Sequence, residues 1–243
     1  MSAKDVAAKN FESHLKNNVY PGRGIVVGKL PTGNFAIVYF IMGRSVNSRN
    51  RRFKFDGDRL WTEPVDESKV SDPSLIIYDA MLATNNVHLV SNGDQTKTIY
   101  DFYQQGDCFT KALRTREREP DAPNYTPRIS AMIDFSGNTP KIYMSVLSAN
   151  QVDPAFTDNS MFTPALPGNG NGYCLTTYMG DGDPLPSFNT MPLLMPLEGT
   201  VDEVLDTYWN ALNSENRVSL GVKEIDADGN LVKIVVKNCH DGD

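Results

Sequence analysis

Residues 24–42 read GIVVGKL (24–30), PTGN (31–34) and FAIVYFIM (35–42). The two outer segments are rich in β-branched and aromatic residues, which favour strands. The middle segment combines proline, glycine and asparagine, which is typical of a turn. The pattern predicts a β-hairpin whose second strand ends directly before residue 43.

The same reasoning predicts two more hairpins. One joins residues 128–135 to 141–147 across SGNTP, and the other joins residues 217–225 to 230–237 across DADGN. Hairpins imply antiparallel sheets. Further strands are expected at residues 59–65, 75–78, 87–90 and 173–179.

Apolar residues at helical spacing predict helices at 4–16, 98–116 and 201–212. Thr200 and Glu203 form the pattern of a capping box before the last of these. Residues 151–171 are rich in Pro, Gly, Asn and Asp and are expected to form a long surface loop. The order of elements lacks regular βαβ alternation, so the predicted class is α+β, with helices packed on antiparallel sheets.

The composition excludes several functional classes. The chain has 243 residues, enough for one large domain or two small ones, and a net charge of −7, which argues against a nucleic-acid-binding surface. No apolar run is long enough to span a membrane, and the N-terminus lacks the apolar core of a signal peptide. Three widely spaced cysteines, Cys108, Cys174 and Cys239, suggest reduced thiols in a cytoplasmic protein.

Residues 43–53, GRSVNSRNRRF, contain four arginines. Arginine presents a planar fork of donors that fits phosphate or carboxylate. A solvated basic loop is the alternative, but Ser45, Asn47, Ser48 and Asn50 add neutral donors and acceptors, which favours a site for a small anion. Arg51 and Arg52 are adjacent and should point in opposite directions in an extended chain, so at most one of them would reach a ligand.

A second polar stretch is NYTPRIS at residues 124–130, which places Arg128 behind a proline at the start of a strand. The preceding PDAP segment, residues 120–123, holds Glu119 near this position. A carboxylate beside an arginine-rich pocket could transfer a proton or orient an amide. The two stretches together predict a site for a phosphate-bearing metabolite.

Residues 20–29, YPGRGIVVGK, resemble a phosphate loop only superficially. Arg23 stands where the first glycine is needed, Leu30 replaces the Ser/Thr, and the glycines precede a strand. Arg23 between two glycines remains either a surface turn or a position where the backbone can approach a ligand closely.

Metal and nucleophile chemistry find little support. The histidines, His14, His88 and His240, are not at ligand spacing, and the aspartates near residues 181 and 226 lack the later acidic ligands of a calcium loop. Ser2 would be a terminal nucleophile after removal of Met1, but a helix separates it from the first strand. No Ser-His-Asp grouping can be argued.

Five phrases occur in order: YPGRG (20–24), GRSxxSRNR (43–51), IYDAM (77–81), EPDAPNYTPRIS (119–130) and TYxGDGxPLPSF (177–188). Together they resemble the archaeal-type IMP cyclohydrolase family and its bacterial relatives, from about residue 20 to residue 196. The resemblance implies a single domain over residues 1–243. It also implies a four-layer αββα sandwich similar to N-terminal nucleophile hydrolases, without their terminal nucleophile.

The reaction that this resemblance implies is ring closure of 5-formamidoimidazole-4-carboxamide ribotide to IMP, with loss of water. It needs an anchor for the 5′-phosphate, a donor for the developing oxyanion and an acid or base. The resemblance implies a purine ribotide as partner, with no metal, no redox cofactor and no covalent intermediate.

Carried over residue by residue, the resemblance gives two groups of site residues. The arginines Arg44, Arg49 and Arg51 are expected to include the phosphate anchors. Tyr78 and Glu119 are expected to transfer protons or orient the carboxamide, and Arg23 and Arg128 to polarise an oxygen. Arg23 and Arg128 could instead be structural partners of Glu119 and Asp121. The remaining substrate-binding residues are Ser45, Asn50, Asn124 and Thr126.

The chain departs from the compact archaeal pattern in an N-terminal helical extension (1–19), the 151–171 loop and a C-terminal hairpin and tail (217–243). These additions could reshape the mouth of the pocket or an interface in a homo-oligomer. Two other functions stay open at this point: a non-catalytic purine-ribotide-binding protein, and an amidohydrolase acting on a related ribotide.

Overall fold

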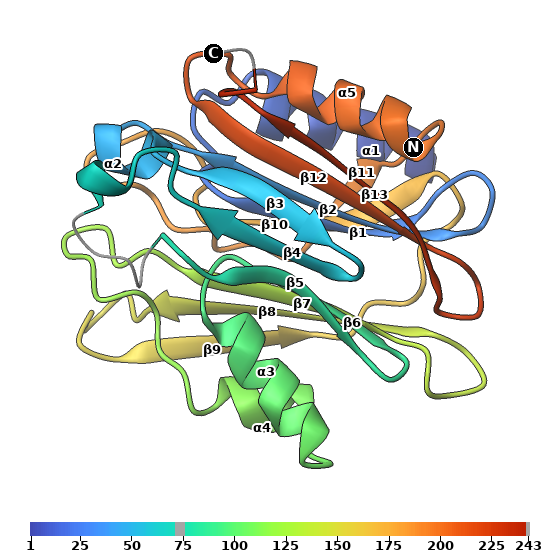
Figure 1. Cartoon of the computed structure of the whole chain (residues 1–243). Helices are drawn as coiled ribbons and strands as arrows, with labels where there is room; N and C mark the ends of the chain where they lie inside the picture. The colour runs from blue at the N-terminus through green and yellow to red at the C-terminus, as the bar shows by residue number, and fades with distance from the viewer. Residues whose placement is uncertain (71–75, 242–243) are drawn as a thin grey trace.

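The computed structural model describes residues 1–70 and 76–241, which form two antiparallel sheets packed face to face (Figure 1). The first sheet has the order β11-β10-β1-β2-β12-β13. Its strands are β1 (Gly24–Lys29), β2 (Phe35–Met42), β10 (Asn171–Thr176), β11 (Leu193–Pro196), β12 (Arg217–Ile225) and β13 (Leu231–Asn238).

The second sheet has the order β3-β4-β5-β6-β7-β8-β9. Its strands are β3 (Arg52–Asp56), β4 (Arg59–Glu63), β5 (Asp79–Thr84), β6 (Val87–Ser91), β7 (Arg128–Asp134), β8 (Lys141–Ala149) and β9 (Thr157–Phe162). All strand pairs in both sheets are antiparallel, so the predicted α+β class is confirmed.

The longer helices lie on the outer faces of the two sheets (Figure 1). Helix α1 (Ala3–Phe11), its π-helical continuation η1 (Glu12–Lys16) and α5 (Val201–Ala211) cover the first sheet, whereas α3 (Gln95–Gln104) and α4 (Phe109–Leu113) cover the second. Two short helices, α2 (Val46–Arg49) and the 3₁₀ turn η2 (Glu67–Lys69), lie in connections. The capping box of Thr200 and Glu203 at α5 is confirmed.

The alternation of side chains along β2 shows why the strand is apolar throughout. Ala36, Val38 and Phe40 face the helices α1 and α5, whereas Ile37 and Tyr39 face the second sheet. A strand with both faces covered gains from apolar residues at every position. The hairpin predicted at 24–42 is confirmed, with Val26 opposite Val38.

The helix predicted at 98–116 is wrong in its extent, because it is two helices. Helix α3 starts earlier, at Gln95, and ends at Gln104, and α4 begins at Phe109. Gly106 lies between them with a φ of +80°, a conformation that favours glycine and ends a helix.

Three strand predictions need correction. Residues 76–78 of the strand predicted at 75–78 are irregular and β5 follows them, while residue 75 lies outside the described residues. The strand predicted at 173–179 starts earlier and ends at Thr176. Strand β3 was not predicted, because its polar residues resembled a continuation of the arginine loop.

The 151–171 segment is not a continuous loop. Residues Thr157–Phe162 form β9, the edge strand beside β8. Its sequence, TDNSMF, is mostly polar because one of its edges and much of its surface remain exposed, so composition alone resembled a loop. The short strand β11 was missed for lack of an alternating pattern.

Two buried histidines predict a dependence of stability on pH. Burial lowers the pKa of His14 to about 4, and burial together with the nearby Lys223 lowers that of His88 to about 4. The unfolded chain therefore takes up protons below pH 6.5 that the folded chain does not, and folding loses stability as the pH falls. Between pH 7.5 and 5, we expect a loss of about 2 kcal/mol per histidine.

Urea unfolding at the two pH values tests this expectation. His14→Gln and His88→Gln should each reduce the difference in the free energy of unfolding between pH 7.5 and pH 5 by about 2 kcal/mol. This holds whatever stability the substitution itself removes at pH 7.5. Variants that lose as much unfolding free energy between pH 7.5 and pH 5 as the wild type would contradict this expectation.

Candidate functional site

A cavity of about 310 Å³ lies at one end of the sheet sandwich. Four chain segments supply most of its wall: the chain entering β1 at Arg23, the chain leaving β2 at residues 44–51, the segment before β7 at residues 119–126, and the chain after β10 at Tyr178. Ile76, before β5, also lines it. Because β1 pairs antiparallel with both β2 and β10, its start lies beside their ends. The fold therefore brings together residues that are far apart in sequence.

Arg23 and Glu119 form a buried ion pair at this cavity. Arg23 Nη1 lies 3.1 Å from Glu119 Oε1, and Nη2 donates to Oε2 at 3.1 Å. Arg23 Nη1 also donates to the carbonyl of Asn92 at 3.2 Å. Burial opposes the charge of Arg23, but Glu119 and the surrounding tyrosines raise its pKa well above the ordinary value. Arg23 is therefore paired with Glu119, and its expected role in polarising a substrate oxygen stays a prediction.

The arginine loop is shaped by a short capped helix. Ser45 Oγ accepts from the Ser48 amide at 3.1 Å and thereby starts α2. Arg44 remains exposed, stacks over the ring of Tyr20 at 4.9 Å and pairs with Asp181. Ser45 and Arg44 both line the cavity.

Arg51 and Arg52 point in opposite directions, as predicted. Arg52 pairs with Glu63 on β4 at 2.7 Å, away from the cavity. Arg51 lines the cavity, is only 6% exposed, and donates through Nε to the Ser48 carbonyl at 2.8 Å. Its Nη1 is buried and meets no acceptor in residues 1–70 and 76–241.

Asn47 lines the cavity; it is among the polar residues that the sequence indicates in the arginine loop, but the family resemblance did not carry it over as a site residue. Its Oδ1 is buried and receives no hydrogen bond from the described part of the chain. A buried unpaired donor on Arg51 and an unpaired acceptor on Asn47 are costly unless a ligand or water completes them. The guanidinium of Arg51 is suited to an oxyanion, whereas the Asn47 oxygen is suited to a donor group.

Asp121, Thr126 and Tyr178 form a second polar group on the cavity wall. The Thr126 amide donates to Asp121 Oδ1 at 2.7 Å, and the Thr126 hydroxyl donates to Asp121 Oδ2. Thr126 Oγ1 also lies 2.6 Å from the Tyr178 hydroxyl. Burial raises the pKa of Tyr178 to about 12, so the phenol keeps its proton at neutral pH.

Seven of the eleven residues expected at the site line this cavity, and four do not. The seven are Arg23, Arg44, Ser45, Arg51, Glu119, Asn124 and Thr126. Asn50 instead binds the backbone of Asp66 through both ends of its amide, at 2.7 and 2.8 Å. The carbonyl of Arg49 lies 3.0 Å from His240 Nε2.

Tyr78 and Arg128 lie behind the cavity wall. The Tyr78 hydroxyl is 2.7 Å from that of Tyr39, which is fully buried. Arg128 Nη1 donates to Asp94 at 2.7 Å and to Gln95 at 2.8 Å. Its structural partner is therefore Asp94 and not Asp121, and burial lowers the pKa of Arg128.

Asp121 and Tyr178 could have been found from the sequence, because both lie in the phrases that carry the family resemblance. Asn47 falls on an unspecified position of its phrase. No sequence pattern identifies an amide whose oxygen is buried and unpaired, since that depends on the position of α2.

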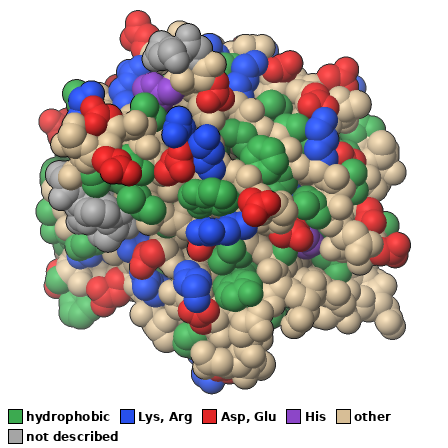
Figure 2. Space-filling model, viewed as in Figure 1, with side chains coloured by type: hydrophobic (Ala, Val, Ile, Leu, Met, Phe, Trp, Pro, Cys, Tyr) green, Lys and Arg blue, Asp and Glu red, His purple; other side chains and the backbone are tan. Residues whose placement is uncertain are grey.

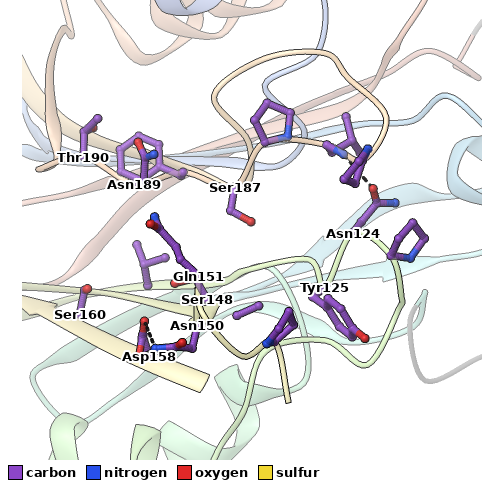
Figure 3. A pocket seen from close by; sticks show the side chains of 18 of the residues that line it. Asn124, Tyr125, Ser148, Asn150, Gln151, Asp158, Ser160, Ser187, Asn189 and Thr190 are labelled. Carbon is purple, nitrogen blue, oxygen red and sulfur yellow. Dashed lines mark hydrogen bonds between the residues drawn. The ribbon is translucent and has the colours of Figure 1, made fainter. Parts of the chain in front are cut away.

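A larger cavity, about 720 Å³, is drawn in Figure 3. It adjoins the first, because Asn124 and Leu185 line both. Its wall carries amides and hydroxyls, such as Gln151, Ser187 and Asn189, and the described residues contribute no lysine or arginine to it. The carboxylate on this wall, Asp158, accepts from the Asn150 amide at 3.1 Å. The larger cavity is suited to uncharged polar groups and not to an anion.

Basic and acidic side chains are interspersed on the face shown in Figure 2, without a broad region of one sign. Within residues 1–70 and 76–241, no group of three or more His, Cys, Asp or Glu is placed to hold a metal ion. The same residues contain no helix long and apolar enough to cross a membrane.

Fold and site define a class: an α+β sandwich of two antiparallel sheets with a pocket lined by Arg23, Arg44 and Arg51. Residues 20–229 match the family described as "IMP cyclohydrolase-like protein", and the chain belongs to that family.

Three archaeal relatives carry the name IMP cyclohydrolase. That of Methanocaldococcus jannaschii is 26% identical over 226 residues, covering 90% of this chain and 99% of the relative. That of Methanopyrus kandleri is 27% identical, covering 72% and 82%. That of Methanothrix thermoacetophila is 34% identical over 122 residues, covering 47% and 58%.

Proposed function

We propose that this protein is an IMP cyclohydrolase that closes the ring of 5-formamidoimidazole-4-carboxamide ribotide to give IMP and water. The observation that carries the proposal is the buried, incompletely paired guanidinium of Arg51 in a cavity that also holds the Arg23–Glu119 pair. The family membership and the names of the relatives support it. The layering of helices outside two packed sheets also supports a likeness to the N-terminal nucleophile hydrolases.

In this proposal the 5′-phosphate binds to Arg51 and Arg44. Arg51 is a buried cation without a carboxylate partner in the described residues, so an oxyanion at Nη1 would balance its charge. Arg44, at the exposed rim, would guide the phosphate toward Arg51, because Arg44 can exchange its ion pair with Asp181 for one with the ligand. Arg49 stays a predicted anchor at the edge of α2.

The ring closes near Arg23 and Glu119. The carboxamide nitrogen must attack the formyl carbon, which places negative charge on the formyl oxygen. Arg23 offers preorganised donors for that oxygen, and Glu119 fixes the guanidinium from the opposite side. Tyr78 and Arg128 would support this pair without lining the cavity. Tyr78 is held by its hydrogen bond with Tyr39, and the positive charge of Arg128 interacts with the carboxylate of Glu119.

A direct assay tests the function. Purified protein should convert the ribotide to IMP in the presence of EDTA, followed by the absorbance of the product. Glu119→Gln is expected to lower kcat about 100-fold or more, because an amide no longer balances Arg23, and Tyr78→Phe should lower it less.

Different outcomes separate the alternatives. Saturable IMP binding without turnover would identify a non-catalytic binding protein. Release of formate instead of IMP would identify an amidohydrolase. Unchanged turnover in both variants would remove Tyr78 and Glu119 from the mechanism. As a biosynthetic enzyme, the protein is expected to work in the cytoplasm, where its three cysteines would stay reduced.

A further inference from the structure

The hydroxyl groups on the cavity wall have a fixed direction. A carboxylate only accepts hydrogen bonds, so the single proton of the Thr126 hydroxyl points to Asp121 Oδ2. Thr126 Oγ1 must then accept from the Tyr178 hydroxyl, 2.6 Å away. The chain of donors therefore runs from Tyr178 through Thr126 to Asp121.

This direction leaves the phenol oxygen of Tyr178 as an acceptor. Its proton is committed to Thr126, and its side chain lines the cavity while being only 5% exposed. A ligand N–H placed against Tyr178 would complete a continuous path of three hydrogen bonds ending at a carboxylate. No lysine or arginine within the described residues pairs with Asp121, in contrast to Glu119, whose two oxygens both contact Arg23.

We propose that Tyr178, Thr126 and Asp121 form a proton relay that removes the proton from the attacking nitrogen of the substrate. This inference rests on the proposed function. Tyr178 is the catalytic residue, because it would touch the substrate, and Thr126 and Asp121 act through it. Glu119, whose amide donates to the Thr126 carbonyl at 3.0 Å, is then left to hold Arg23 beside the relay.

In this step the carboxamide nitrogen forms a bond to the formyl carbon, and the π electrons of the formyl group move to its oxygen beside Arg23. The nitrogen's proton moves to the Tyr178 oxygen as the phenol proton moves to Thr126 and the Thr126 proton to Asp121. The proton then returns to the former formyl oxygen, which leaves as water with a second proton from the formamide nitrogen.

Matched substitutions test the relay. Thr126→Val keeps the shape of the side chain but lacks the hydroxyl, whereas Thr126→Ser keeps the hydroxyl. We expect Thr126→Val, Tyr178→Phe and Asp121→Asn to lower kcat about 100-fold with little change in KM, and Thr126→Ser to retain most of the activity.

Kinetics in mixtures of H₂O and D₂O provide a readout that a structural role would not move. Wild-type kcat should fall in a curved dependence on the deuterium fraction, because several protons move together, and Thr126→Val should give a weak or linear dependence. Circular dichroism and IMP binding would show that the variants are folded.

The outcomes are distinct. An active wild type with unchanged kcat and isotope dependence in Thr126→Val would overturn the relay and leave the cyclohydrolase standing. Equal losses of kcat in Thr126→Val and Thr126→Ser would also overturn the relay, because a variant that keeps the hydroxyl would then be as slow as one that lacks it. A wild type without cyclohydrolase activity would overturn the proposed function itself.

Discussion

Replacement of Arg51 by methionine is expected to raise the KM for the ribotide about 100-fold with a small effect on kcat. Arg51 is buried, lines the cavity and has an unpaired Nη1 among the described residues, so charge-assisted bonds from its guanidinium to the phosphate would persist from the bound substrate to the transition state. Bonds of this kind contribute about 1.5–3 kcal/mol, which corresponds to roughly 10- to 150-fold in binding.

The neighbouring Arg52 provides the matched control. It has the same charge one residue further along, but pairs with Glu63 outside the cavity. Arg52→Met should leave KM within about twofold of the wild type. Steady-state kinetics on both variants, with calorimetric titration of IMP, measure the difference. An equal effect of the two substitutions would indicate that general charge attracts the ligand and that no specific phosphate anchor exists at Arg51.

Replacement of Arg23 by methionine is expected to destabilise the folded protein by about 3–5 kcal/mol, because it leaves the buried carboxylate of Glu119 without a partner. The double variant Arg23→Met/Glu119→Leu should recover much of this loss, since no charge then remains buried. Both variants should be inactive, because the donors for the developing oxyanion are gone.

Urea unfolding of the two single variants and the double variant forms a double-mutant cycle. The coupling energy isolates the Arg23–Glu119 interaction from the cost of each substitution alone. A double variant as unstable as the sum of the single variants would show that the pair is not coupled. Retained catalysis in the double variant would remove both residues from the proposed mechanism.

Local pattern was sufficient for much of the fold. The three hairpins and α5 carry signals within 10 to 20 consecutive residues, and the structure has them close to the expected positions. The polar edge strand β9 and the strand β3 were missed, because half-exposed strands have compositions close to those of loops. Gly106 broke a helix whose apolar spacing continued across it.

The site was less accessible to sequence reasoning. The arginine motif located one wall, and the divergence of Arg51 and Arg52 followed from simple backbone geometry. The partner of Arg128, however, is Asp94, which carries no recognisable pattern and comes close only through the pairing of β6 with β7. The unpaired oxygen of Asn47 likewise depends on packing and not on residue type.

Most of the cavity wall comes from four segments that precede or follow β1, β2, β7 and β10, strands drawn from both sheets. No single hairpin of this protein contains the binding surface. A bound ribotide therefore adds its free energy of binding to the unfolding equilibrium of the whole sandwich. The metabolite would thus stabilise the packing of the two sheets against each other. The lifetime of the protein in the cell would then depend on the supply of its own substrate.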